Sequence, residues 1–247
     1  MLRVIISGYS GTMGKVLTRC VNEDRELQIV CGVSKDNLEV PFKTYNKMSD
    51  IEESADIIID FSHHSAINDV LAYATKTKTP LVISTTGFNE EELSNIKEAS
   101  AITPIFHSSN MSLGVNVLVK LVKEAAKALN GFDIEIIEKH HNKKLDAPSG
   151  TAVMIADGIK EVLPESEYIY GRHGRSDKRS SNEVGIHAIR GGTIVGEHTT
   201  IFAEHDEVVE IKHTAQSKDI FAKGAIAAAK FLANKEAGYY NMNNMLD

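Results

Sequence analysis

A short stretch in the middle of the chain carries residue types that could do acid–base chemistry. Residues 140–151 read His-His-Asn-Lys-Lys-Leu-Asp-Ala-Pro-Ser-Gly-Thr, so histidines and lysines crowd into its first half. Histidine exchanges protons near neutral pH, and crowding of several cations favours proton release from a lysine among them. A solvated basic loop is the simpler interpretation of this run, and a site for an anionic substrate is the more specific one.

The second half of the stretch favours the anion site. Pro148 disfavours helix at Ala147, and Ser149 can cap a helix that starts at the next residue. The N–H groups of Gly150 and Thr151 then lie in the first helical turn, where they can bind a carboxylate or a phosphate. We therefore predict an anion site directly beside potential proton donors.

A glycine-rich turn near the N-terminus is the second informative feature. Gly8, Gly11 and Gly14 follow an apolar run over 2–7 and precede a helical pattern, as in turns that hold a dinucleotide phosphate. Their spacing departs from the commoner Gly-x-Gly-x-x-Gly, and three glycines can also make a merely tight connection. We expect this turn to hold the pyrophosphate of a dinucleotide.

The end of the second expected strand bears on which dinucleotide is used. An acidic residue there binds the ribose 2′-hydroxyl and repels a 2′-phosphate, whereas this chain has Ser34 and Lys35. Ser34 has no charge to repel a phosphate and Lys35 could pair with one, which favours NADPH, or the use of both NADPH and NADH. Asp36 weakens this preference, and Lys35 can equally be an ordinary exposed lysine.

The apolar patterns that position these residues change near residue 112. Before it, unbroken apolar strands interleave with helices, which indicates a parallel sheet covered on both faces. After it, strands alternate apolar and polar residues, which favours an open mixed or antiparallel sheet with one apolar face. Strands are expected at 2–7, 27–33, 56–61, 80–84, 104–107, 132–139, 184–189, 193–204 and 208–213. Helices are expected at 65–78, 89–101, 113–129, 149–163 and 217–235.

Bulk composition argues against several other classes of protein. Charged residues make up 25% and apolar residues 42% of the 247 residues, as in ordinary globular proteins. The net charge of -7 argues against general binding to nucleic acids or anionic membranes, and no apolar run approaches the roughly 20 residues that span a bilayer. The N-terminus has no secretion signature, and Cys20 and Cys31 lack metal-type spacing, so we expect reduced thiols in a cytoplasmic protein.

Residues 138–152 closely resemble the signature of the 4-hydroxy-tetrahydrodipicolinate reductases, the dihydrodipicolinate reductases of bacterial lysine biosynthesis. The similarity extends over nearly the whole chain. Supporting segments are the glycine turn, Asp60-Phe61-Ser62, Thr85-Thr86-Gly87-Phe88, 110–114 and 183–198.

The resemblance implies a role for each of these segments. His140 would donate or accept a proton and Lys144 would be the second proton donor. His141, Gly150 and Thr151 would hold the substrate carboxylates. The residues expected at the cofactor are Gly8, Tyr9, Ser10, Gly11, Thr12, Met13, Ser34, Lys35, Ser84, Thr85, Thr86, Ser108, Ser109, Asn110 and Met111. The reaction would be NAD(P)H-dependent reduction of 4-hydroxy-tetrahydrodipicolinate to tetrahydrodipicolinate, in the diaminopimelate and lysine pathway.

The resemblance also implies the organisation of the chain. The fold class would be α/β, with a Rossmann-like dinucleotide-binding domain over 1–112 and 218–247, because the last helix returns to that domain in the family. An α+β domain over 113–217 would bind the small dicarboxylate substrate and assemble a homotetramer. A nucleic acid, a membrane or a metal is not expected as a partner.

Four departures from the family pattern lie on the cofactor side. They are Ser34, the pair His63-His64, Ser84 and Met111. They put cofactor preference and affinity in question, but not the reaction. Paired histidines could suggest a metal, but no third ligand with zinc-type spacing follows, so we interpret them as surface histidines.

Two other functions remain open from the sequence. A semialdehyde or polyol dehydrogenase would keep the glycine turn, but it needs no anion site at 144–151, and the chain offers no obvious cysteine nucleophile. A non-catalytic NADPH-binding sensor or scaffold would keep the turn and lose the proton donors. His140 and Lys144 are both present, which counts against that second alternative.

Overall fold

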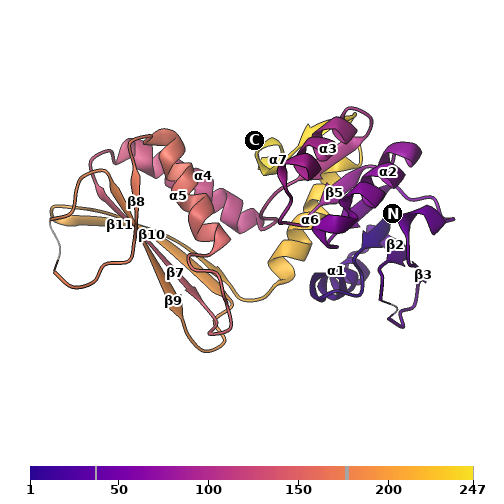
Figure 1. Cartoon of the computed structure of the whole chain (residues 1–247), viewed down its shortest axis with the longest axis horizontal. Coiled ribbons are helices and arrows are strands. Elements are labelled where there is room, and N and C mark those ends of the chain that lie inside the picture. Colours follow the sequence, from indigo (N-terminus) through magenta and orange to yellow (C-terminus); the bar gives the residue numbers. More distant parts are fainter. Residues whose placement is uncertain (37, 176–177, 247) are drawn as a thin grey trace. The chain divides into compact units, whose positions relative to one another are not determined.

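The computed structural model describes residues 1–36, 38–175 and 178–246, and the chain forms two compact units. Unit 1 comprises Met1–Leu113 with Lys218–Asp247, and unit 2 comprises Gly114–Ser217 (Figure 1). Within the described residues, no helix combines the length and the apolar character needed to cross a membrane.

Unit 1 is built on a 7-stranded parallel sheet whose inner strands are buried apolar runs. Its strands are β1 (Leu2–Ser7), β2 (Leu27–Val33), β3 (Lys43–Tyr45), β4 (Ile57–Asp60), β5 (Leu81–Ile83), β6 (Pro104–His107) and β12 (Gly238–Tyr240). They lie in the order β12-β6-β5-β4-β1-β2-β3. Successive strands run outward from β1 in both directions, so the topological switch point lies between β1 and β4.

Helices cover both faces of this sheet, as expected for unbroken apolar strands. Alternate residues of β1 enter different cores: Val4 and Ile6 pack with one cluster and Ile5 with the other. The first cluster includes residues of α1 (Thr12–Glu23) and α6 (Asp219–Leu232), and the second includes residues of α2 (Ile67–Thr77) and α3 (Glu90–Ser100). The sheet is therefore the middle layer of three, as Figure 1 shows.

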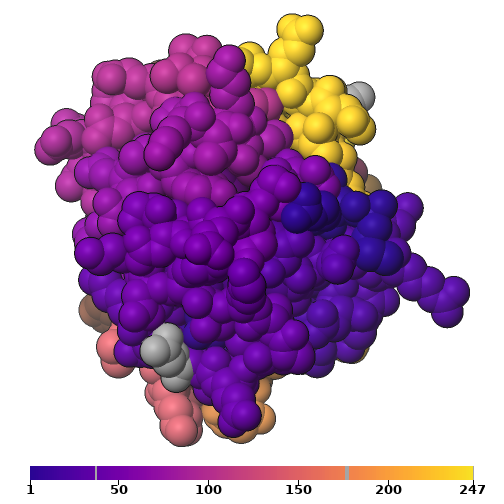
Figure 2. Space-filling model, turned by 90° about the vertical axis from the view of Figure 1, so that its right-hand side faces the viewer, coloured from indigo at the N-terminus to yellow at the C-terminus, as the bar shows by residue number. Residues whose placement is uncertain are grey.

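The C-terminal segment returns to unit 1 through specific contacts. Asp219 at the start of α6 lies 2.7 Å from Arg19 of α1, and β12 adds to the sheet beside β6. Gly224 lets α6 approach closely, because a Cβ built there would lie 1.6 Å from the carbonyl oxygen of Met111. The short helix α7 (Met242–Leu246) follows. Figure 2 accordingly shows residues from both ends of the chain, indigo and yellow, on one face of this unit.

Unit 2 has a 5-stranded mixed sheet with helices on one face. Its order is β11-β10-β7-β9-β8, where β7 is parallel to β9 and antiparallel to β10. The strands are β7 (Asp133–His140), β8 (Glu167–Tyr170), β9 (Glu183–Arg190), β10 (Gly196–Glu204) and β11 (Glu207–Ala215). Helices α4 (Leu113–Ala128) and α5 (Gly150–Val162) pack on the face that carries Ile134, Ile136 and Phe202 (Figure 1).

The expected fold class is confirmed, and the strands at 2–7, 27–33 and 104–107 coincide with β1, β2 and β6. The strand expected at 193–204 begins later, at Gly196. Strands β3, β8 and β12 were not expected. Each is short and lies at an edge of its sheet, where one-sided pairing leaves little apolar pattern to recognise.

Candidate active site

The parallel sheet of unit 1 gathers the expected cofactor residues at one edge. Because C-terminal ends of parallel strands meet at the same edge, the turns after β1, β2, β4, β5 and β6 are neighbours there. These turns contain the expected groups 8–13, 34–35, 84–86 and 108–111. Open α/β sheets bind ligands outside this edge at the switch point, which here lies between β1 and β4.

The glycine turn has the close backbone approach that a phosphate-binding turn requires. Gly8 has a φ of +82°, and a Cβ built on it would lie 2.6 Å from the carbonyl oxygen of Phe61. A Cβ on Gly14 would lie 2.1 Å from the carbonyl oxygen of Gly8. Gly11 is the N-cap of α1 and has no side chain to cap it, so the first-turn N–H groups of Thr12 and its neighbours suit an anion.

Two of the expected cofactor residues turn their side chains into the core. Tyr9 is 1% exposed and packs edge-on against Phe42, and its hydroxyl accepts a hydrogen bond from the Leu38 N–H at 3.2 Å. Met111 is also buried and packs in the same core, and Met13 is partly buried against it. Tyr9 and Met111 would therefore contact a ligand through their backbone groups and not through their side chains.

Buried polar groups lie at the carboxyl ends of β4 and β5. The Asp60 carboxylate is fully buried and accepts hydrogen bonds from Thr85 Oγ1 at 2.6 Å and from the Ser62 N–H at 3.3 Å. The pKa of Asp60 is raised, because the effect of burial exceeds that of the hydrogen bonds, which act to lower it. Ser84 Oγ is buried without a hydrogen-bond partner in the described part of the chain. A native structure rarely leaves such a group unsatisfied, so Ser84 fits a site that a ligand completes.

The remaining expected cofactor residues lie in exposed or half-buried turns. Ser10 and Ser34 share a hydrogen bond of 2.6 Å between their hydroxyl oxygens, and Lys35 is exposed beside them. Thr86 and Ser109 are exposed as well. Asn110 shapes its own turn, because its Oδ1 accepts a hydrogen bond from the Ser112 N–H at 2.9 Å and its carbonyl accepts one from Ser108 Oγ.

The paired histidines lie at the same edge of the sheet, after β4. His63 is exposed, and its ring centroid lies 4.2 Å from that of His64. His64 Nδ1 lies 2.9 Å from Glu92 Oε1, and Glu92 is also the acidic member of the capping box that Asn89 forms at the start of α3. His64 therefore ties the turn after β4 to α3.

In unit 2, the first expected proton donor ends strand β7. His140 is 9% exposed, and its Nδ1 lies 2.6 Å from Oε2 of Glu138. The Glu138 carboxylate is 0% exposed and accepts hydrogen bonds from Nη1 and Nη2 of Arg190, at 2.8 and 2.6 Å, and from the Ser149 N–H at 3.0 Å. Burial alone would raise the pKa of Glu138, but the hydrogen bonds from Arg190, His140 and Ser149 outweigh it and hold that pKa below its ordinary value.

The second expected proton donor has an anionic partner. Lys144 Nζ lies 2.9 Å from Asp146 Oδ1, and the hydrogen bond from Lys144 lowers the pKa of Asp146. Lys144 was expected among crowded cations, whereas the folded loop pairs it with the Asp146 carboxylate. The carbonyl of Asp146 in turn accepts a hydrogen bond from Arg190 Nη2 at 2.6 Å, so the loop that carries Lys144 is tied to β9.

The expected anion site lies at the start of α5. The Ser149 hydroxyl accepts a hydrogen bond from the Ala152 N–H at 3.2 Å, so the predicted N-cap is confirmed. Gly150 and Thr151 form the first helical turn, and a Cβ on Gly150 would meet nothing within 4 Å, so the space above it is open. His141 is partly exposed at the start of the connecting loop.

Three residues of this cluster were missed from the sequence: Glu138, Arg190 and His198. His198 is 4% exposed, its Nε2 lies 2.9 Å from Ser149 Oγ, and its ring packs edge-on against His140 at 5.2 Å. Burial, and then the nearby His140, lower the pKa of His198 to about 4, so it is neutral at physiological pH. The available signal was the strand period, which puts Glu138 on the same, otherwise apolar, face as His140.

Comparison with known proteins decides the family. The model for the N-terminus of dihydrodipicolinate reductase matches residues 2–111, and the model for its C-terminus matches residues 114–246. The chain belongs to the dihydrodipicolinate reductase family. The expectation drawn from residues 138–152 is thereby confirmed.

Individual dihydrodipicolinate reductases match over the full length. The chain is 54% identical over 247 residues to a 4-hydroxy-tetrahydrodipicolinate reductase of Caldanaerobacter subterraneus, with 100% of this chain and 98% of the relative covered. Identity to the Clostridium tetani protein of that name is 48% over 250 residues, with the same coverage. A dipicolinate-bound dihydrodipicolinate reductase from a Paenisporosarcina species has the same fold, with a TM-score of 0.85, 22% identity and 99% of each chain covered.

Proposed function

We propose that the chain catalyses the NAD(P)H-dependent reduction of 4-hydroxy-tetrahydrodipicolinate to tetrahydrodipicolinate, in the pathway to diaminopimelate and lysine. One observation carries this proposal. The buried carboxylate of Glu138 contacts both His140, which would move a proton, and Ser149, the N-cap of α5. A proton donor and an anion-binding helix terminus are thus neighbours, as reduction of a dicarboxylate requires. The names of the relatives, and the dipicolinate bound to one of them, agree with this substrate class.

The substrate carboxylates would be held by His141, Gly150 and Thr151. N–H groups in the first turn of α5, together with the partial positive charge of that terminus, favour a carboxylate there. Loss of the 4-hydroxyl group of the substrate as water gives a conjugated imine. Hydride addition to that imine leaves negative charge on the ring, and a proton must neutralise it. His140 would exchange that proton through Nε2, because Nδ1 is engaged by Glu138, and Lys144 Nζ would be the second donor.

The cofactor would be held at the carboxyl edge of the unit 1 sheet. The N–H groups of residues 8–13 would bind the pyrophosphate, Ser34 and Lys35 would face the adenosine ribose, and residues 84–86 and 108–111 would line the nicotinamide side. When bound, the nicotinamide supplies the hydride. Uncharged Ser34, hydrogen-bonded to Ser10, and exposed Lys35 would accept either NADPH or NADH.

We further propose a cytoplasmic homotetramer that assembles through the second sheet. Helices α4 and α5 cover one face of that sheet, and the other face carries Ile189 and Val208, which are 45% and 60% exposed. Such side chains favour association with further copies of the chain. Light scattering after size exclusion is expected to give four times the chain mass, and a monomer would contradict this assembly.

The buried free thiols of Cys20 and Cys31 suit a reducing compartment.

The activity is tested by loss of NAD(P)H absorbance. Substrate would be made in place by the preceding synthase from pyruvate and aspartate semialdehyde, with NADH and NADPH compared side by side. Lys144→Ala is expected to lower kcat by about 100-fold or more while the affinity for the cofactor stays within twofold. Equal losses of kcat and cofactor affinity would refute a chemical role for Lys144. Cofactor binding without any synthase-dependent oxidation would instead favour the sensor function.

A further inference from the structure

We infer that Glu138 is a positioning residue, which holds His140 in one tautomer and couples it to the start of α5. This inference rests on the proposed role of His140 as the group that exchanges a proton with the substrate. It assigns a task to a carboxylate that would not itself touch the substrate.

Both oxygens of the Glu138 carboxylate have all their hydrogen-bond acceptor positions occupied. Oε2 accepts from His140 Nδ1 at 2.6 Å and from Arg190 Nη1 at 2.8 Å, and Oε1 accepts from the Ser149 N–H at 3.0 Å and from Arg190 Nη2 at 2.6 Å. Four donors satisfy the four favourable acceptor positions of a carboxylate. Since the group is also completely buried, it cannot rotate without leaving a charged donor unpaired.

This arrangement fixes the tautomer of His140. An ionised carboxylate only accepts hydrogen bonds, so Nδ1 carries the hydrogen and Nε2 is the nitrogen left to exchange a proton. Gly196 on β10 keeps room beside that nitrogen, because a Cβ built there would lie 3.1 Å from Nε2. A carboxylate behind an imidazole also stabilises the imidazolium that forms when Nε2 takes up a proton.

The same carboxylate holds the other half of the proposed site. Its hydrogen bond to the Ser149 N–H fixes the residue that caps α5, and the Ser149 hydroxyl contacts His198 Nε2 at 2.9 Å. The charged and titratable groups that surround His140 are thus Glu138 on β7, Arg190 on β9, His198 on β10 with His213 beside it on β11, and Lys144 in the loop. His198 is buried and neutral, so it adds no competing charge.

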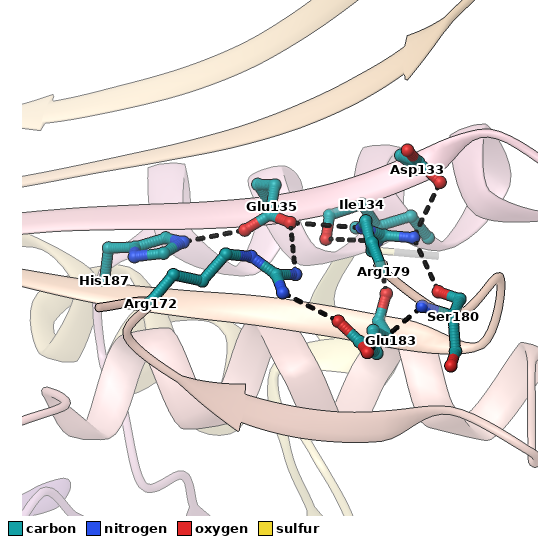
Figure 3. Close-up of polar contacts among 8 residues, drawn as sticks. All are labelled: Asp133, Ile134, Glu135, Arg172, Arg179, Ser180, Glu183 and His187. Atoms are coloured by element: carbon teal, nitrogen blue, oxygen red, sulfur yellow. Dashed lines mark hydrogen bonds and ion pairs between the residues drawn. The ribbon is translucent and has the colours of Figure 1, made fainter. Parts of the chain in front are cut away.

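A second carboxylate on β7 provides a matched control. Glu135 accepts from Arg172 Nη2 at 2.9 Å, from Arg179 Nε at 3.3 Å and from His187 Nε2 at 2.7 Å, as Figure 3 shows. It therefore has arginine and histidine partners like those of Glu138. An odd separation along the strand places the two carboxylates on opposite faces of the sheet, so Glu135 contacts neither His140 nor α5.

The first test uses the unmodified protein. Ring-nitrogen chemical shifts of isotope-labelled histidine, assigned by comparison with His140→Asn, are expected to show the Nδ1–H tautomer of His140 at pH 8. The Nε2–H tautomer, or an even mixture of the two, would overturn the inference. This measurement decides the question even where a substitution of a buried residue prevents folding.

The second test compares Glu138→Gln with Glu135→Gln in the activity assay. Glu138→Gln is expected to lower kcat by about 10- to 100-fold and to raise KM for the substrate, with cofactor affinity within twofold. Glu135→Gln is expected to keep both kcat and KM within twofold.

The outcomes separate this inference from the proposed function. If His140→Asn loses activity while Glu138→Gln keeps the kcat and the KM of the parent protein, the inference is overturned and the proposed function stands. An equal loss in Glu135→Gln and Glu138→Gln would also overturn it, since a general effect on the sheet would then explain both. If His140→Asn keeps full activity, the proposed role of His140 fails, and the inference fails with it.

Discussion

Replacement of Gly8 by alanine tests the geometry of the turn between β1 and α1. Gly8 has a φ of +82°, and its Cβ would lie 2.6 Å from the backbone oxygen of Phe61. A non-glycine residue at positive φ costs about 1–2 kcal/mol, and forcing two packed backbone segments apart adds about 1–3 kcal/mol. We therefore expect Gly8→Ala to lower the free energy of unfolding by about 2–5 kcal/mol.

Gly87 is a matched control in the same unit. Its φ is +85°, but a Cβ built on it would meet nothing within 4 Å. Gly87→Ala should therefore lower the free energy of unfolding only by the backbone cost of about 1–2 kcal/mol. Urea denaturation followed by circular dichroism would compare the variants at one protein concentration, because association changes apparent stability.

Cofactor binding gives the second readout of the same perturbation. Displacement of Phe61 moves the switch point of the sheet, so Gly8→Ala should also weaken dinucleotide binding at least about 10-fold, or about 1.4 kcal/mol, by titration calorimetry. Equal losses of stability in Gly8→Ala and Gly87→Ala would refute the reasoning, since the close approach to Phe61 would then contribute nothing.

Three further predictions concern groups away from the cofactor turn. Burial raises the pKa of the Cys31 thiol to about 12, so iodoacetamide at pH 8 should leave Cys31 unmodified in the native protein; rapid native labelling by mass spectrometry would contradict this. The folded-state pKa of His198, about 4, lies below its unfolded value, so its contribution to stability is present above about pH 6.5 and lost as pH falls toward 4. In denaturant titrations, the free energy of unfolding of His198→Gln should therefore fall by about 2 kcal/mol less between pH 7 and pH 4 than that of the parent protein. Equal falls in the two proteins would argue against a neutral buried histidine. Asn89→Ala should destabilise the protein by about 1 kcal/mol, because Asn89 accepts the Glu92 N–H in a capping box, whereas Asn89→Asp should keep most of that stability.

Local patterns in the sequence predicted most of the elements and part of the site. Unbroken apolar runs identified β1, β2 and β6, and the Ser149 cap identified the start of α5. These signals are local, because periodicity and capping depend on residues within a turn or two of each other. For the same reason, Gly150 and Thr151 could be predicted to lie in a first helical turn.

The sequence was less informative wherever the environment of a side chain decides its role. Tyr9 and Met111 lie in the expected cofactor turns, yet their side chains fill the core, because the sheet and α6 close over them. Lys144 was expected among cations, and the folded loop gives it Asp146 as a partner. Burial and pairing of this kind depend on which elements pack together.

By itself, the sequence determined the order of most strands and helices, the glycine turn and the identity of the residues that could exchange protons. Those properties follow from residue types and short spacings. Only the tertiary structure decided that Glu138 meets Arg190, 52 positions away, and that His198 comes to rest beside Ser149 and His140. The physical reason is that strand pairing between β7, β9 and β10 sets these contacts, and pairing depends on the register of the whole sheet.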